Sequence, residues 1–116
     1  MKIIFYLGTC DTCTRILKEL NPGSDVILQD IKKEKITEEQ IDKMRNLAGS
    51  YQSVFSKVAK KYKAMGLNEM QLTEKDYRKY ILIEYTFLKR PVIIVDDKIF
   101  IGNSEKAISD AKAALA

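Results

Sequence analysis

The feature that most constrains the fold of this chain is its pair of cysteines, Cys10 and Cys13, which separate two different hydrophobic patterns. The strand-like run 2–7 before them is largely apolar and ends in Gly8-Thr9. After them, apolar residues recur at helical spacing as far as Leu20. This order predicts a Cys-x-x-Cys motif at the turn from a buried strand into a helix.

The rest of the chain continues an α/β pattern. The further elements that we predict are a strand at 25–29, helices beginning at Thr37, Tyr51 and Thr73, a hairpin of strands at 92–95 and 99–101, and a helix at 104–115. In the strand, Val26 and Leu28 should share one face. The helix from Tyr51 should run to Met65, with Val58 and Met65 inward. The order β-α-β, helices, β-β-α is that of the thioredoxin fold with a mixed sheet.

Composition points to one domain, 1–116, with the helical insertion at about 37–86. Hydrophobic residues make up 46%, and no apolar run approaches the roughly 20 residues of a membrane span. The apolar start is too short for a signal peptide, and Cys10-Asp11 follows where a small-residue cleavage site would be. We therefore expect a cytoplasmic protein without membrane contact. No extended heptad indicates an oligomer, so we expect a monomer.

The cysteine and histidine counts restrict the chemistry. A secreted disulfide scaffold would have more than two cysteines, spread along the chain. The chain has no histidine, which excludes a Cys-His dyad and leaves a poor ligand set for zinc. We expect no metal and no cofactor. A cytosolic Cys-x-x-Cys beside a β-α pattern is typical of redox chemistry.

A cysteine at a helix start is chemically distinctive. Unpaired N–H groups and the helix dipole stabilise a thiolate there, which lowers its pKa. Cys10 should be the exposed nucleophile, and Cys13, one turn inside, the resolving thiol. Asp11 would oppose the thiolate, whereas Arg15 would favour it if its side chain folded back. The alternative is a pair of buried core cysteines, because Cys13 shares the helical spacing of the apolar residues that follow.

A second signal is Arg90-Pro91, directly before the β-branched run 92–95. A proline is tolerated at the start of a strand, because its missing N–H can lie outside the ladder. In thioredoxin-like folds a proline here is cis and faces the redox cysteine. An ordinary trans proline that ends a loop fits the motif equally well.

Together these segments resemble the arsenate reductase family, which includes the Spx-type regulators. The resemblance rests on the segments 3–6, 10–13, 62–67, 88–93 and 97–102. It implies a thioredoxin-like fold with a helical insertion, a nucleophilic Cys10, and a cis Pro91 with Arg90 near the thiol. It also implies that Thr9 and Thr12, with Arg90 and Pro91, line the substrate site.

The chain departs from the family pattern at two positions. Arsenate reductases of this family place three arginines around the oxyanion, and Arg90 matches one of them. Ser56, with Lys57 beside it, and Gly102 stand at the other two. Serine and glycine cannot replace the paired hydrogen bonds of a guanidinium, so we expect weak arsenate activity. A second cysteine, here Cys13, is instead a feature of Spx-type members.

Two functions remain open at this level. The first is a reductase that draws electrons from glutathione or from a thioredoxin or glutaredoxin. The second is an Spx-like regulator that binds the RNA polymerase alpha subunit, without direct DNA binding, and uses the cysteines as its switch. Lysines at 57, 60, 61 and 63 could meet an acidic partner or nucleic acid, or could form a solvated face. Tyrosines 77, 80 and 85 fit a core better than a site.

Overall fold

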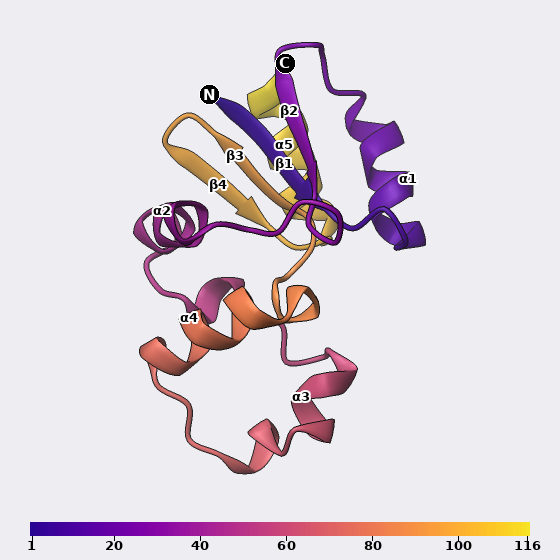
Figure 1. The fold of residues 1–116 in the computed structure, drawn as a ribbon. Helices are drawn as coiled ribbons and strands as arrows, with labels where there is room; N and C mark the ends of the chain where they lie inside the picture. The colour runs from indigo at the N-terminus through magenta and orange to yellow at the C-terminus, as the bar shows by residue number, and fades with distance from the viewer. The chain divides into compact units, whose positions relative to one another are not determined.

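The computed structural model describes residues 1–116, which divide into two compact units (Figure 1). The sheet unit comprises 1–34 and 90–116, and the helical unit comprises 35–89. The sheet unit contains β1 (Lys2–Tyr6), α1 (Asp11–Leu20), β2 (Val26–Asp30), β3 (Val92–Val95), β4 (Lys98–Ile101) and α5 (Glu105–Leu115). The helical unit contains α2 (Glu38–Ala48), α3 (Lys60–Ala64) and α4 (Glu74–Ile83), with the 3-10 turns η1 (Gln52–Val54), η2 (Leu67–Glu69) and η3 (Tyr85–Phe87).

The sheet unit is built on a mixed sheet in the order β2-β1-β3-β4. β1 and β2 are parallel, with Tyr6 opposite Asp30, whereas β1–β3 and β3–β4 are antiparallel. The parallel pair requires a crossover, and α1 supplies it. The predicted β-α-β opening, hairpin and mixed sheet are therefore confirmed.

Helices α1 and α5 pack against one face of this sheet. Their apolar stripes join strand residues in one buried cluster, made of Ile4, Ile16, Leu20, Val26, Ile93, Val95, Ile108 and Ala111. All four residues of the central strand β3 are buried. A strand that is buried on both faces has a continuous run of β-branched residues, so this segment could be identified as a strand from the sequence. The packed α1 fixes the direction in which its first turn faces.

One strand differs from its predicted pattern. Val26 is buried as expected, but Leu28 is 47% exposed, and Gln29 is the second buried residue of β2. β2 is an edge strand with a neighbour on one side only. Side chains of an edge strand such as Leu28 are therefore less buried than the apolar alternation of the sequence predicts.

Two helices of the helical unit begin where the sequence predicts. The hydroxyl groups of Thr37 and Thr73 accept hydrogen bonds from the N–H groups of Gln40 and Asp76, and those side chains bond back to the threonine N–H. Each pair is a capping box, which satisfies two otherwise unpaired N–H groups at the start of a helix. The structure confirms helix starts at both threonines.

The predicted helix from Tyr51 to Met65 is wrong. The chain forms the short turn η1, becomes extended, and enters a helix again only at α3. The Ser56 N–H donates to the Phe87 carbonyl at 2.7 Å, and the Lys89 N–H donates to the Val54 carbonyl at 2.8 Å. These long-range bonds use backbone groups that a continuous helix would need. Val58 is consequently 93% exposed and Met65 46% exposed, rather than inward.

Aromatic rings form the centre of the helical unit. Phe55 lies 4.8 Å from Tyr77, 5.2 Å from Phe87 and 5.9 Å from Tyr62, measured between ring centroids. Such pairs stabilise a core beyond the area that they bury. Tyr77 is buried, as expected, whereas Tyr80 is half-buried with an edge contact to Phe87. None of the helices in this structure has the length and apolar character needed to cross a membrane.

Candidate active site at the start of helix α1

Cys10 occupies the N-cap position of α1. The chain leaves β1 through a tight turn in which the Cys10 N–H donates to the Leu7 carbonyl at 3.0 Å. The backbone of Cys10 is still extended, with φ −97° and ψ 118°, while its carbonyl already accepts from the Thr14 N–H at 3.1 Å. The thiol therefore lies where the unpaired N–H groups of the first turn are found. This is the location that the sequence predicts.

The two thiols differ in accessibility. Cys10 is half-buried, and Cys13 is 1% exposed on the apolar face of α1, in line with Ile16 and Leu20. Both are free thiols. The Cys10 side chain is therefore partly accessible from solvent, whereas the Cys13 side chain is enclosed.

The surroundings of Cys10 lower its pKa. Burial by itself would raise the pKa of this thiol, but three hydrogen-bonding groups and one charge outweigh it. They are the Cys13 N–H, the Cys13 thiol, the Thr12 N–H and the Arg90 guanidinium. The thiol makes no formal capping hydrogen bond, so the N–H groups act by favouring a thiolate once it forms.

The surroundings of Cys13 raise its pKa. Burial is the main cause, and the nearby Cys10 adds to it by its charge and by the hydrogen bond between the sulfurs. A backbone hydrogen bond to Leu7 and the charge of Arg90 act in the opposite direction without reversing the shift. The pair is therefore asymmetric, with the proton favoured on the inner sulfur.

Arg90 and Pro91 lie at the entrance to β3, in the same unit as the cysteines. The Arg90–Pro91 peptide bond is cis, as the resemblance predicts. Pro91 is buried, and its carbonyl accepts from the Gly102 N–H at 2.9 Å, so this turn is tied to the end of β4. Arg90 is half-buried and its charge acts on both sulfurs.

The remaining predicted site residues have different roles. Thr12 contributes its N–H to the stabilisation of a Cys10 thiolate. Thr9 is exposed in the turn before Cys10. Asp11 and Arg15 are also exposed, on the first turns of α1, and Arg90 is the cation that lowers the pKa of Cys10. The structure thus brings Cys10, Cys13, Thr12 and Arg90 together in one unit.

Two supporting residues were not identified from the sequence. The Thr14 hydroxyl donates to the Cys10 carbonyl at 3.2 Å, which helps to hold the N-cap residue. Gly8 packs against the Asp30 carboxylate, and a Cβ at that position would lie 2.5 Å from Asp30 Oδ2. A side chain at position 8 would therefore require the Asp30 carboxylate to move. A glycine two residues before Cys10 was the only signal for this contact in the sequence.

Ser56 and Gly102, at which the resemblance implies further arginines, lie in different units. Ser56 belongs to the helical unit, where it is buried, and Gly102 follows β4 in the sheet unit with φ +87°. No cluster of three or more Cys, Asp or Glu side chains in the structure could hold a metal ion.

Comparison with known proteins agrees with this architecture. No curated protein matches the chain significantly. Among solved structures, it is similar to the arsenate reductase from Vibrio cholerae, with a TM-score of 0.79, 14% identity, and coverage of 95% of this chain and 96% of that one. The YffB protein gives a TM-score of 0.78 at 20% identity, with both chains fully covered. At these identities the likeness establishes the fold.

A third structure is described as a possible arsenate reductase from Streptococcus mutans. It has a TM-score of 0.71 and 24% identity, and the match covers 95% of this chain and 96% of that one. The family model of ArsC matches residues 5–111, which include both cysteines, Arg90 and Pro91. With nearly its whole length covered by that model, the chain belongs to the ArsC family.

Proposed function

We propose that this ArsC-family protein is a thiol–disulfide oxidoreductase in which Cys10 is the nucleophile and Cys13 the resolving thiol. The observation that carries the proposal is the asymmetry of the pair. The accessible sulfur has a lowered pKa, and the buried sulfur has a raised one. A nucleophile needs thiolate character and access, whereas a resolving thiol needs to stay protonated until the first step has occurred.

The reaction has two exchange steps. The Cys10 thiolate attacks one sulfur of a substrate disulfide, forms a mixed disulfide, and releases the other half as a thiolate, which takes a proton from water. Cys13 then loses its proton and attacks the Cys10 sulfur. This step forms the Cys10–Cys13 disulfide and releases the second half of the substrate as a thiol. The substrate gains two electrons and the protein loses two.

An external thiol returns the protein to its reduced form. Glutathione or a reduced thioredoxin or glutaredoxin would supply the two electrons by the reverse exchange. Arg90 would stabilise each thiolate in turn, because its charge acts on both sulfurs. Thr9, Thr12 and Pro91 would border the bound substrate. A reducing compartment, the cytoplasm, suits a site that must regain two free thiols.

Turnover of a small disulfide, coupled to NADPH through a glutathione or a thioredoxin system, tests the proposal. The wild type should turn over, and Cys10→Ser should be inactive. Cys13→Ser should form a mixed disulfide at Cys10 that mass spectrometry detects after one exchange. Full activity in Cys10→Ser would contradict the assignment of the nucleophile.

A second candidate function is redox-dependent binding to the RNA polymerase alpha subunit, as in Spx-type regulators. The observation that favours it is the presence of Ser56 and Gly102 where arsenate-reducing members have arginines. A pull-down of the alpha subunit by the reduced and the diamide-oxidised protein would test it. Binding that changes with oxidation, together with no turnover of disulfides, would favour the regulator over the reductase.

A further inference from the structure

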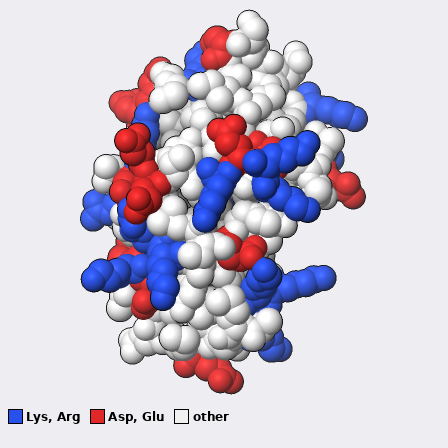
Figure 2. All heavy atoms as spheres, viewed as in Figure 1, with Lys and Arg blue, Asp and Glu red and all other residues white.

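The segment 57–65 of the helical unit has an unusual combination of charge and exposed apolar surface. Helix α3 contains no buried residue. Lys57, Lys60 and Lys63 are exposed, and no ion pair holds them. In Figure 2 blue side chains project at the lower right, over the part of the chain where Figure 1 places α3. Exposed lysines alone are explained by a solvated surface. Whether this segment binds a partner therefore depends on the apolar residues among the lysines.

Those apolar residues are more exposed than a solvated face requires. Val58 is 93% exposed and Met65 is 46% exposed. Both residues lie within the lysine-bearing segment 57–65, so apolar side chains and cations are exposed on the same short stretch of chain. We call the five residues Lys57, Val58, Lys60, Lys63 and Met65 the α3 surface.

One ion pair links α3 to the residue before the turn η3. Lys61 Nζ contacts the Glu84 carboxylate, which also accepts from the N–H and the hydroxyl of Thr86. Lys61 is therefore already paired within the protein and is less available to a partner than the other lysines. Lys60 and Lys63, three residues apart on the helix, are neighbours on its outer side. Lys60 and Lys63, which no ion pair holds, are therefore available to a partner on the helix α3.

We infer that the α3 surface binds an acidic polypeptide segment that carries apolar side chains. Carboxylates of the partner would pair with Lys60 and Lys63, and its apolar residues would cover Val58 and Met65. Charge complementarity selects the sign of the partner and increases the association rate. This inference is independent of the thiol chemistry, because none of these residues belongs to the cysteine site.

Nucleic acid fits this surface less well than an acidic polypeptide. Phosphate binding needs cations, but binding of unpaired bases also needs exposed aromatic faces. Tyr62, the aromatic residue of α3, is half-buried with its ring in edge contact with Phe55. The exposed side chains between the lysines are aliphatic, which suits a protein partner.

The test is fluorescence anisotropy with three labelled probes: a peptide of glutamate and leucine, a peptide of glutamate alone, and a short DNA duplex. The variant Lys60→Glu/Lys63→Glu should bind the glutamate–leucine peptide about tenfold more weakly than the wild type does. Its control is Lys18→Glu/Lys98→Glu, which makes the same change in net charge at two exposed lysines of the sheet unit. The control should lose no more than about twofold.

A second variant separates the apolar contribution. Val58→Ser should weaken binding of the glutamate–leucine peptide several-fold and leave binding of the glutamate peptide unchanged. Thermal unfolding should show that every variant is folded at the temperature of the binding assay, since the altered residues are exposed. Equal losses in the α3 and control variants would overturn the inference. So would tighter binding of the DNA duplex, which would make the surface a nucleic-acid site.

Discussion

At the scale of single residues, the site depends on how one helix start distinguishes two chemically identical thiols. Cys10 at the N-cap is accessible and faces the N–H groups of the first turn, whereas Cys13 is enclosed by the core. Arg90 is the one charge that acts on both. The asymmetry therefore comes from burial and hydrogen bonding, and Arg90 shifts the pKa values of the pair downward together.

Removing the charge of Arg90 tests this assignment. Arg90→Gln should raise the pKa of Cys10, because a positive charge no longer favours the thiolate. Arg90→Lys should keep part of the effect. Arg15→Gln, which removes an exposed arginine of α1, is the matched control and should leave the pKa nearly unchanged. The ultraviolet absorbance of the thiolate, followed against pH in a Cys13→Ser background, measures all three. Equal shifts at both arginines would contradict a specific role for Arg90.

A second residue-scale prediction concerns arsenate. Each charged hydrogen bond to an oxyanion is worth about 1.5–3 kcal/mol. Serine and glycine at two arginine positions should therefore reduce the arsenate rate by roughly two to four powers of ten. Arsenate-dependent NADPH oxidation, coupled through glutathione and glutaredoxin, is the measurement, with a small disulfide as the comparison. Rapid arsenate turnover that disappears in Cys10→Ser would show that the missing arginines are not needed.

At the scale of helices and strands, helix starts could be predicted from the sequence, whereas an apolar helical pattern misled where the backbone pairs with a distant segment. The helix starts at Thr37 and Thr73 were predicted correctly, and the residues that cap each helix lie within four positions of each other. The segment from Tyr51 to Met65 has a helical apolar pattern as well. Its backbone nevertheless pairs with the segment 87–89, and no pattern within the segment reveals that partner.

Thr37 offers a direct test of helix capping. Thr37→Ala removes the side-chain acceptor for the Gln40 N–H at 3.1 Å and should lower the free energy of unfolding by about 1 kcal/mol. Thr37→Ser keeps the hydroxyl and should lose much less. Urea unfolding followed by circular dichroism compares them. A loss in the serine variant as large as that in the alanine variant would show that the methyl group, rather than the cap, stabilises this helix start.

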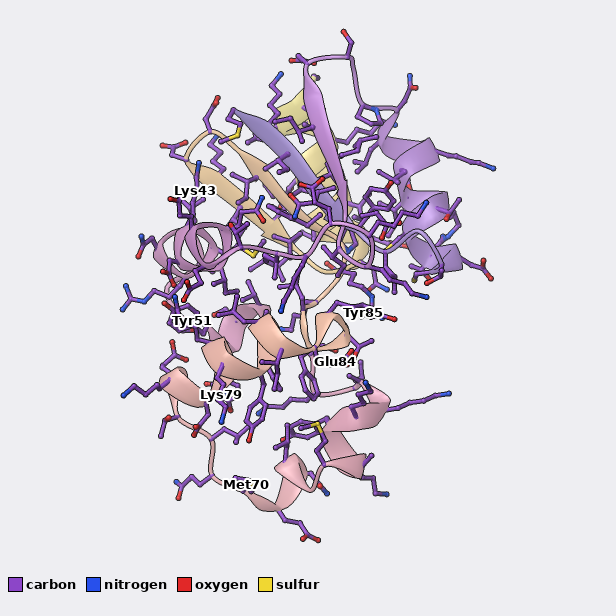
Figure 3. All side chains as sticks on the ribbon, viewed as in Figure 1. Lys43, Tyr51, Met70, Lys79, Glu84 and Tyr85 are labelled. Carbon is purple, nitrogen blue, oxygen red and sulfur yellow. The ribbon has the colours of Figure 1, made fainter.

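The elements of the helical unit are joined by a charged network centred on Asp42 of α2. Arg78 of α4 donates through Nε to Asp42 Oδ1 at 2.8 Å, and the Tyr51 hydroxyl donates to the same oxygen at 2.6 Å. Figure 3 labels Tyr51 beside α2. The hydrogen bonds from Arg78 and then Tyr51 lower the pKa of Asp42 from 3.8 to about 2.

This network predicts an acid-dependent loss of stability. Because the pKa of Asp42 is lower in the folded than in the unfolded chain, its ionised carboxylate stabilises the folded state when the pH is above the pKa of the unfolded chain. That contribution disappears as the pH falls from about 4 to about 2. Asp42→Asn should be less stable than the wild type at neutral pH, and the difference should shrink as the pH falls through that range. Thermal unfolding at several pH values measures it. A difference that is constant with pH would mean that the ionisation of Asp42 does not stabilise the fold.

At the scale of the whole molecule, the chain separates its chemistry from its charged surface. The sheet unit contains both cysteines, Arg90 and the cis proline, and the helical unit contains the α3 surface.

The position of the thiols could be predicted from the sequence because the strand, the Cys-x-x-Cys motif and the helix follow one another in the chain. The closeness of Arg90, eighty residues later, was available only through the family resemblance. The closeness of Gly8 to the Asp30 carboxylate depends on the pairing of β1 with β2 and was not predicted.

The most direct test of the account is the rate of thiol alkylation against pH in Cys13→Ser and Cys10→Ser. Each variant keeps one sulfur, and serine keeps a hydroxyl in place of the other. Cys10 should react faster at neutral pH and titrate below the ordinary thiol value of about 8.5, whereas Cys13 should react slowly and titrate above it. Faster reaction at Cys13, or titration of Cys10 at or above the ordinary value, would contradict the assignment of Cys10 as the nucleophile.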